Sequence, residues 1–141
     1  MADGDVRELR LVVTVDDYDE ALRFYRDVLG MPEREAHEVE GGHVAILDAG
    51  RATLELTDPV HAAYIDDVEV GHRAAGHVRV ALRVEDSQEA TGRVTDAGAE
   101  LVAPPTVTPW RSLNARFEAP AGLQLTLFSD APDDLQVGDR P

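Results

Sequence analysis

The sequence predicts an α+β fold in which two βαβββ modules follow one another. The prediction rests on a repeated pattern: residues 15–30 read as a strand end followed by a capped helix, and residues 80–100 repeat that order. The two halves also end alike, since ATLELT at 52–57 resembles LQLTLF at 123–128. Repetition of this kind indicates an internal duplication of one supersecondary unit.

The 141 residues have room for a single domain with a sizeable core. We expect the domain, residues 1–141, to contain module one at about 8–57, a connector at 58–76, module two at about 77–129 and a flexible acidic tail at 130–141. The tail is rich in Asp, Pro and Gly and has few large apolar residues, which is typical of a frayed chain end.

Module one starts with an alternating strand over 8–15 and continues into a helix that we expect to begin near Asp17. Asp17 is a suitable N-cap, and Glu20 stands at the spacing of a capping box. One apolar stripe follows at helical spacing, comprising Ala21, Leu22, Tyr25, Val28 and Leu29. Gly30 and Pro32 then end the helix.

Three short strands complete module one, and a connector follows. We expect these strands at 32–39, 43–47 and 52–57, separated by turns at Gly41–Gly42 and Ala49–Gly50. The connector is long for a loop without structure of its own. It therefore wraps the domain or carries a short helix at 60–65.

Module two repeats this order of elements. We expect a strand over 77–84, a helix from Asp86, and strands over 100–107, 112–118 and 123–128, the last two joined by a turn at 119–122. In each strong strand the aliphatic side chains occupy one side, which we expect to face the helix of that module. The opposite sides then line a second, concave surface, which includes Arg10, Glu55, Arg79 and Thr126.

Composition excludes several classes of function. Hydrophobic residues make up 43% and charged residues 29%, and no apolar run approaches the roughly 20 residues of a membrane span. No secretory signal is visible, so we expect a cytoplasmic protein without a membrane partner. The absence of cysteine removes disulfides and thiolate chemistry. The net charge of −15 argues against a nucleic-acid partner, because phosphate contacts require clustered positive charge.

The helix signature DxxxALRFYRDVLGM at 17–31, the duplication and the PxG turn at 120–122 resemble the vicinal oxygen chelate family, which includes glyoxalase I, the extradiol dioxygenases and the bleomycin resistance proteins. The resemblance covers about 9–129. It departs from the family at Ala119, because an Asp usually precedes that proline. The resemblance implies a concave, partly open β-barrel cleft with the helices outside, and a homodimer.

In the metalloenzymes of that family, the metal is held at the centres of the first and last strand of each module, which correspond here to Arg10, Glu55, Arg79 and Thr126. Only Glu55 can be a metal ligand, because arginine is always protonated and has no acceptor atom. The resemblance therefore implies a cleft without a metal or another cofactor. The alternative is a displaced metal site made of His43, Glu55 and His77.

Arg10, Glu55 and Arg79 form a plus-minus-plus triplet in this interpretation. Either Glu55 neutralises both arginines in a buried salt-bridge network, or one guanidinium stays free and binds a carboxylate, phosphate or enolate oxygen bidentately. Between two arginines the charged form of Glu55 should be favoured, which makes it a weak base at neutral pH. We therefore expect no catalytic residue.

Aromatic residues near the cleft suggest a planar ligand. In relatives that resemble bleomycin resistance proteins, aromatic side chains at the cleft mouth stack on planar ligands, a role that Trp110 and Tyr64 can fill here. Trp110 has an equal claim to a place in a dimer interface. Phe117 and Phe128 are expected in the core, and further polar strand positions that can line the cleft are Asn114, Arg116 and Gln124.

These observations favour a homodimeric, metal-free protein that binds a small organic ligand, anionic or planar, in the manner of the drug-sequestering members of the family. One alternative is a lyase, isomerase or dioxygenase of the glyoxalase type with a displaced metal site. Another is a regulatory module or subunit whose cleft is vestigial and whose surface binds another protein.

Overall fold

The computed structural model of the protein describes residues 5–28, 30–119 and 123–141. The expected PxG turn at 120–122 and the stripe residue Leu29 lie outside the described residues. The elements within these ranges are β1 (Glu8–Thr14), α1 (Tyr18–Leu22), the π-helical segment η1 (Arg23–Val28), β2 (Glu33–Val39), β3 (Gly42–Ala49), β4 (Ala52–Thr57), α2 (Pro59–Glu69), β5 (Val78–Arg83), α3 (Ser87–Asp96), β6 (Glu100–Val107), β7 (Ser112–Ala119) and β8 (Leu123–Asp130).

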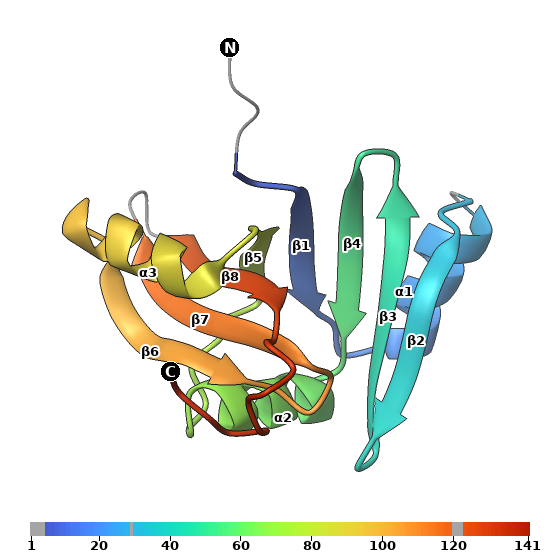
Figure 1. Ribbon diagram of the computed structural model, residues 1–141. Coiled ribbons are helices and arrows are strands. Elements are labelled where there is room, and N and C mark those ends of the chain that lie inside the picture. The colour runs from blue at the N-terminus through green and yellow to red at the C-terminus, as the bar shows by residue number, and fades with distance from the viewer. Residues whose placement is uncertain (1–4, 29, 120–122) are drawn as a thin grey trace.

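All the strands belong to one sheet in the order β2-β3-β4-β1-β5-β8-β7-β6 (Figure 1). The two modules meet at its centre, where β1 pairs antiparallel with β5. Within each module the first strand pairs parallel with the last, β1 with β4 and β5 with β8. The predicted α+β fold of two βαβββ modules is confirmed, and the sheet remains open.

The predicted helix caps form in both modules. Asp17 accepts a hydrogen bond of 3.0 Å from the backbone N–H of Glu20, and Asp86 accepts bonds of 3.0 and 3.2 Å from the backbone N–H groups of Gln88 and Glu89. The first helix differs from the expectation, because the α-helix ends at Leu22 and continues as η1.

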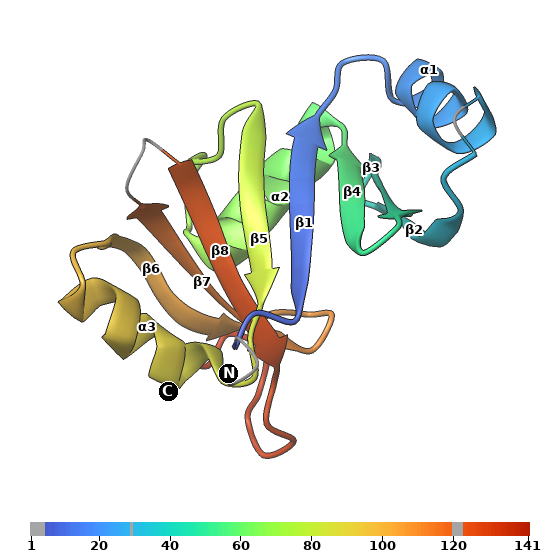
Figure 2. The same cartoon turned by 90° about the horizontal axis from the view of Figure 1, so that it is seen from above.

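The two repeated helices cover the outer side of opposite halves of the sheet (Figure 2). The segment α1–η1 packs on a hydrophobic cluster of module one that includes Ala45, Leu47 and Leu56. Helix α3 contacts β6, β7 and β8 over a second cluster that includes Phe117 and Leu127. Each module thus buries the aliphatic side of its own sheet under its own helix.

The connector forms a longer helix than expected, and this helix lies on the concave side of the sheet (Figure 1). Asp58 is its N-cap, and Pro59 occupies the first turn, where its missing N–H costs nothing. Helix α2 contacts β3 and β4 of module one and β7 of module two. Its first turn lies so close to Gly42 that an added Cβ would stand 2.5 Å from the backbone nitrogen of His61. In the described part of the chain, no helix is long and apolar enough to cross a membrane.

One expectation about the strand faces is wrong at the centre of the sheet. Leu9 and Leu11 of β1 were expected to face a helix, but they are 45% and 38% exposed, as is Val78 of β5 at 41%. Helices α1 and α3 each cover their own module. They leave uncovered the outer side of the paired strands β1 and β5, the seam between the modules. Val12, on the opposite face of β1, faces the concave side and is buried with Ala81 and Phe128.

Two loops differ from the sequence-based expectation. The turn between β2 and β3 is formed by Glu40 and Gly41, both with positive φ, so that Gly42 begins β3. The tail, expected to be frayed, forms hydrogen bonds with the body of the domain. Arg111 donates to the carbonyls of Pro132 and Leu135, and the backbone of Val107 bonds with Gly138 and Asp139.

Candidate functional site

The concave side of the sheet holds a cavity of about 400 Å³. All six residues predicted from the sequence to bind a ligand line it: Arg10, Glu55, Tyr64, Arg79, Trp110 and Thr126. The strand register explains the placement of the central pair, since Val12 of β1 lies directly opposite Glu55 of β4 on one side and Arg79 of β5 on the other. Residues directly opposite each other in a sheet share a face.

Arg79 is a buried cation that lacks a carboxylate partner. Its side chain is 6% exposed, and its Nη1 donates a 2.7 Å hydrogen bond to the hydroxyl of Thr126. Its Nε forms no hydrogen bond, and no carboxylate oxygen of the described residues lies within 4.0 Å of its guanidinium. Burial, together with the nearby charge of Arg116, lowers the pKa of Arg79. The guanidinium nevertheless remains charged, because arginine does not deprotonate in proteins.

Arg10 is engaged by two carboxylates. Its Nε donates to Glu8 at 2.7 Å, and its Nη1 lies 3.5 Å from Oε1 of Glu55. Glu8 also lies within ion-pair distance of Arg34 and Arg83. The expected triplet is therefore half formed, because Glu55 pairs with Arg10 and not directly with Arg79. Glu8 was not among the predicted site residues, although it shares a face of β1 with Arg10. Its other partners, Arg34 and Arg83, come from β2 and β5, and no local spacing connects them to it.

The expectation for the charge state of Glu55 is wrong in direction. Burial raises the pKa of the Glu55 carboxyl above its ordinary value, although the charges of Arg79 and Arg10 oppose the rise. The sequence placed Glu55 between two arginines but did not reveal how deeply the carboxyl is buried or that only Arg10 is close. Loss of solvation therefore outweighs the favourable charges.

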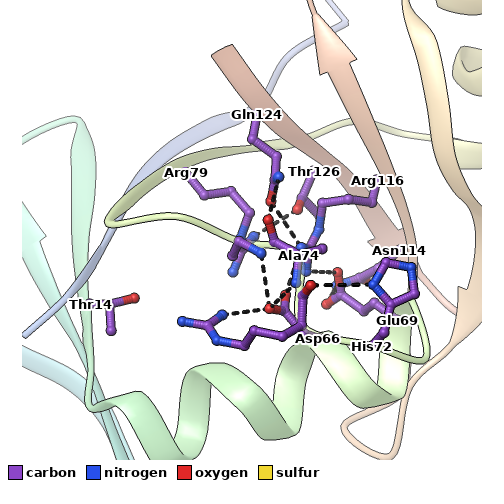
Figure 3. A network of polar contacts seen from close by, with 12 residues as sticks. Thr14, Asp66, Glu69, His72, Ala74, Arg79, Asn114, Arg116, Gln124 and Thr126 are labelled. Atoms are coloured by element: carbon purple, nitrogen blue, oxygen red, sulfur yellow. Dashed lines mark hydrogen bonds and ion pairs between the residues drawn. The ribbon is translucent and has the colours of Figure 1, made fainter. Parts of the chain in front are cut away.

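A buried ion-pair network joins α2 to module two (Figure 3). Arg116 of β7 donates to Asp66 at 2.8 Å and to Glu69 at 2.9 Å, and the side chains of all three are at most 2% exposed. Asp66 also accepts bonds from the backbone N–H groups of Ala74 and Ala75. Burial alone would raise the pKa of Asp66, but these hydrogen bonds lower it.

The network determines which of the predicted polar strand residues reach the cavity. Asn114 lines the cavity and donates to Glu69 at 2.9 Å. Arg116 and Gln124 do not line it, because they bond to the network and to the carbonyl of Ala74. Both buried carboxylates of α2, Asp66 and Glu69, are satisfied by these donors.

An aromatic wall, formed by His61, Tyr64 and Trp110, lines the cavity from α2 and from the loop before β7. The His61 and Tyr64 rings have centroids 5.6 Å apart, and those of Tyr64 and Trp110 are 6.3 Å apart. Burial lowers the pKa of His61, which favours the neutral imidazole. His61 was not among the predicted site residues, because the connector showed no periodicity that would place it on the concave side. Phe117 lies in the core as expected, whereas Phe128 both packs in the core and lines the cavity.

Comparison with known proteins agrees with this architecture. The sequence profile of the glyoxalase/bleomycin resistance protein/dioxygenase superfamily matches residues 9–127. The chain belongs to this superfamily. Over 127 residues it is 29% identical to a probable lactoylglutathione lyase of Synechocystis sp., which covers 85% of this chain and 92% of the relative.

Solved structures of superfamily members have the same fold. Methylmalonyl-CoA epimerase from Mycobacterium tuberculosis superposes with a TM-score of 0.64 at 21% identity, covering 94% of this chain and 93% of the epimerase. A glyoxalase/bleomycin resistance protein/dioxygenase superfamily member from Vibrio splendidus superposes with a TM-score of 0.61 at 15% identity, covering 86% of this chain and 97% of the other.

The donor set of this superfamily member does not fit a divalent ion. At the four strand centres, Arg10 and Arg79 supply no lone pair, and Thr126 is occupied by Arg79. The displaced set is not assembled either, since His43 bonds to Asp58 at 2.8 Å and, unlike Glu55, does not line the cavity. Among the described residues, no group of three or more His, Asp or Glu side chains can hold a metal ion.

The Arg116 network predicts a large loss of stability when its cation is removed. Arg116→Ala leaves Asp66 and Glu69 buried without their main partner, which should lower the free energy of unfolding by about 3–5 kcal/mol. Arg93→Ala is the matched control, because Arg93 is half exposed and solvent screens its ion pair with Glu89, so its removal should change the stability little. Urea unfolding followed by circular dichroism measures both. Equal effects of the two substitutions would contradict a structural role for the network.

Proposed function

We propose that this protein binds a small organic anion in the concave cavity without a metal ion, as a drug-sequestering member of its superfamily would. The observation that carries the proposal is the state of Arg79, a buried guanidinium that lines the cavity. Among the described residues it has no carboxylate partner, and its Nη2 forms no hydrogen bond with them. A buried donor without a partner costs free energy, and a ligand oxygen that pairs with it recovers this cost.

The other walls of the cavity support a planar organic ligand. A volume of about 400 Å³ is within the range of small-molecule sites. Tyr64 and Trp110 place their rings at one side of the cavity, and Trp110 is 45% exposed, which is suitable for a residue at the mouth. Thr126 orients the Arg79 fork through its hydroxyl. We expect such a binding protein to act in the cytoplasm.

The proposal predicts binding that depends on both the acid and Arg79. Native mass spectrometry first reports any ligand or metal that the purified protein carries. Benzoate, 4-hydroxybenzoate and indole-3-propionate are then titrated by calorimetry against their neutral amides. We expect at least one acid to bind and its amide to bind at least tenfold more weakly, because a charge-assisted hydrogen bond contributes about 1.5–3 kcal/mol.

Arg79→Met should abolish acid binding, whereas the surface substitution Arg93→Gln should leave it unchanged. Circular dichroism establishes that both variants are folded. Acid binding that survives in Arg79→Met, or amides that bind as well as acids, would refute the site assignment.

We also propose a homodimer that buries the seam on the outer side of the sheet. The exposed Leu9, Leu11 and Val78 lie there on paired strands, and Leu11 is directly opposite Val80. An apolar strip at the centre of a sheet is suited to a twofold contact. Leu11→Glu should convert a dimer to a monomer in native mass spectrometry, whereas Val60→Glu, on exposed α2 surface, should not. A monomeric wild-type protein would end this proposal.

A lyase or isomerase activity is a second candidate, favoured by Glu55. A buried carboxyl with a raised pKa inside a cavity is a suitable proton-transfer group. The named relatives suggest lactoylglutathione and methylmalonyl-CoA as test substrates. If this activity exists, the wild-type protein should convert one of them and Glu55→Gln should reduce the rate at least 100-fold. Chromatography that detects no conversion by the wild type would remove this candidate.

A further inference from the structure

A carboxyl group and a guanidinium group lie across the cavity from each other without forming a pair. Glu55 and Arg79 both lie beside Val12, one on each neighbouring strand. Their Cα atoms are therefore separated by two strand spacings, about 9.6 Å. No ion pair within 4.0 Å joins them in the described structure. The side chains point into the same cavity, so the space between them is bounded by a cation on one side and a carboxyl on the other.

Glu55 has hydrogen-bonding capacity that the protein does not use. Its Oε1 lies 3.5 Å from Arg10, a long contact, and its Oε2 has no hydrogen-bond partner among the described residues. An unpaired oxygen that was fully enclosed would be a buried atom without a partner, and Oε2 is not one of these atoms. It is therefore accessible from the cavity that Glu55 lines. A carboxylate accepts several hydrogen bonds, and this one therefore has a free acceptor directed at the ligand space.

The other carboxylates near Arg79 are fully used. Glu69 accepts bonds from Arg116 and Asn114 through its two oxygens. Asp66 accepts from Arg116, Arg73 and two backbone N–H groups. Arg10 is already paired with Glu8 at 2.7 Å and with Glu55 at 3.5 Å. Arg79, in contrast, has no carboxylate within 4.0 Å among the described residues, and Glu55 keeps an unbonded oxygen.

We propose that the ligand is a compact zwitterion of the amino-acid class, whose carboxylate binds Arg79 and whose ammonium group binds Glu55. This inference rests on the proposed anion-binding function and names its substrate class. A zwitterion supplies an acceptor to Nη2 of Arg79, which has no hydrogen-bond partner among the described residues and is not enclosed, and a donor to Oε2 of Glu55 at once. The ligand thereby bridges Glu55 and Arg79, which lie on either side of Val12 in the free protein. The aromatic wall then receives an apolar or planar side chain.

The test uses three probes that share one ring system and differ in charge. L-Tryptophan carries both groups, indole-3-propionate carries the carboxylate alone, and tryptamine carries the ammonium alone. Isothermal titration calorimetry on the wild-type protein should give tryptophan an affinity at least tenfold higher than that of either single-charge probe. Because this comparison needs no substitution, it does not depend on the folding of a variant.

Substitutions then assign each contact. Glu55→Gln keeps the size of the side chain and should remove the preference for tryptophan, so that the variant binds tryptophan no more tightly than it binds indole-3-propionate. Arg79→Met should abolish binding of both. Glu85→Gln, on a residue outside the cavity, is the matched control and should change neither.

The outcomes separate this inference from the proposal on which it rests. If indole-3-propionate binds as tightly as tryptophan and Glu55→Gln has no effect, the zwitterion is wrong and the anion site stands. If tryptamine binds best, or if none of the three probes binds, the zwitterion is also wrong. Loss of acid binding in Arg79→Met remains the separate criterion for the anion site.

Discussion

The fold depends on the buried ion pairs that hold α2 inside the concave side of the sheet. A helix in this position must bury Asp66 and Glu69, which is costly unless each carboxylate is paired and hydrogen-bonded. Arg116 of β7 supplies charge to both, and backbone N–H groups of the following loop complete Asp66. The helix contacts β3 and β4 of module one, so this one arginine joins the two modules across the cavity.

The same network explains why Arg79 remains available. Glu69 and Asp66 stabilise the charge of Arg79 through space, but their oxygens are directed at other donors. Arg79 therefore stays charged while, in the described part of the chain, Thr126 alone accepts a hydrogen bond from its side chain. A metalloenzyme would place a divalent cation near the strand centres, whereas this chain has the guanidinium group of Arg79 there. A guanidinium offers planar, paired donors to an oxygen ligand and no vacant coordination position, which suits recognition of an acid.

Strand periodicity was sufficient to predict the four central strand residues of the cavity but not their partners. Side chains alternate along a strand, so Arg10, Glu55, Arg79 and Thr126 could be assigned to one face from local sequence. Their contacts depend on the register of β1 with β4 and β5, and Arg34 of β2 reaches Glu8 from a strand that no local pattern places beside it. The depth of burial is also non-local. For that reason the pKa of Glu55 and the exposed seam at Leu11 were both predicted in the wrong direction.

The charge of the whole molecule limits what can enter the cavity efficiently. A net charge of −15 repels anions at distances up to roughly a Debye length, about 8–10 Å at physiological ionic strength. The attraction of Arg79 is confined to the buried site, where its field is screened little. A simple anion must therefore cross a repulsive region before it reaches its partner. A zwitterion has no net charge and avoids this repulsion, yet it offers a carboxylate to Arg79 at short range. The acidic surface and the separated side chains of Glu55 and Arg79 thus both favour a zwitterion.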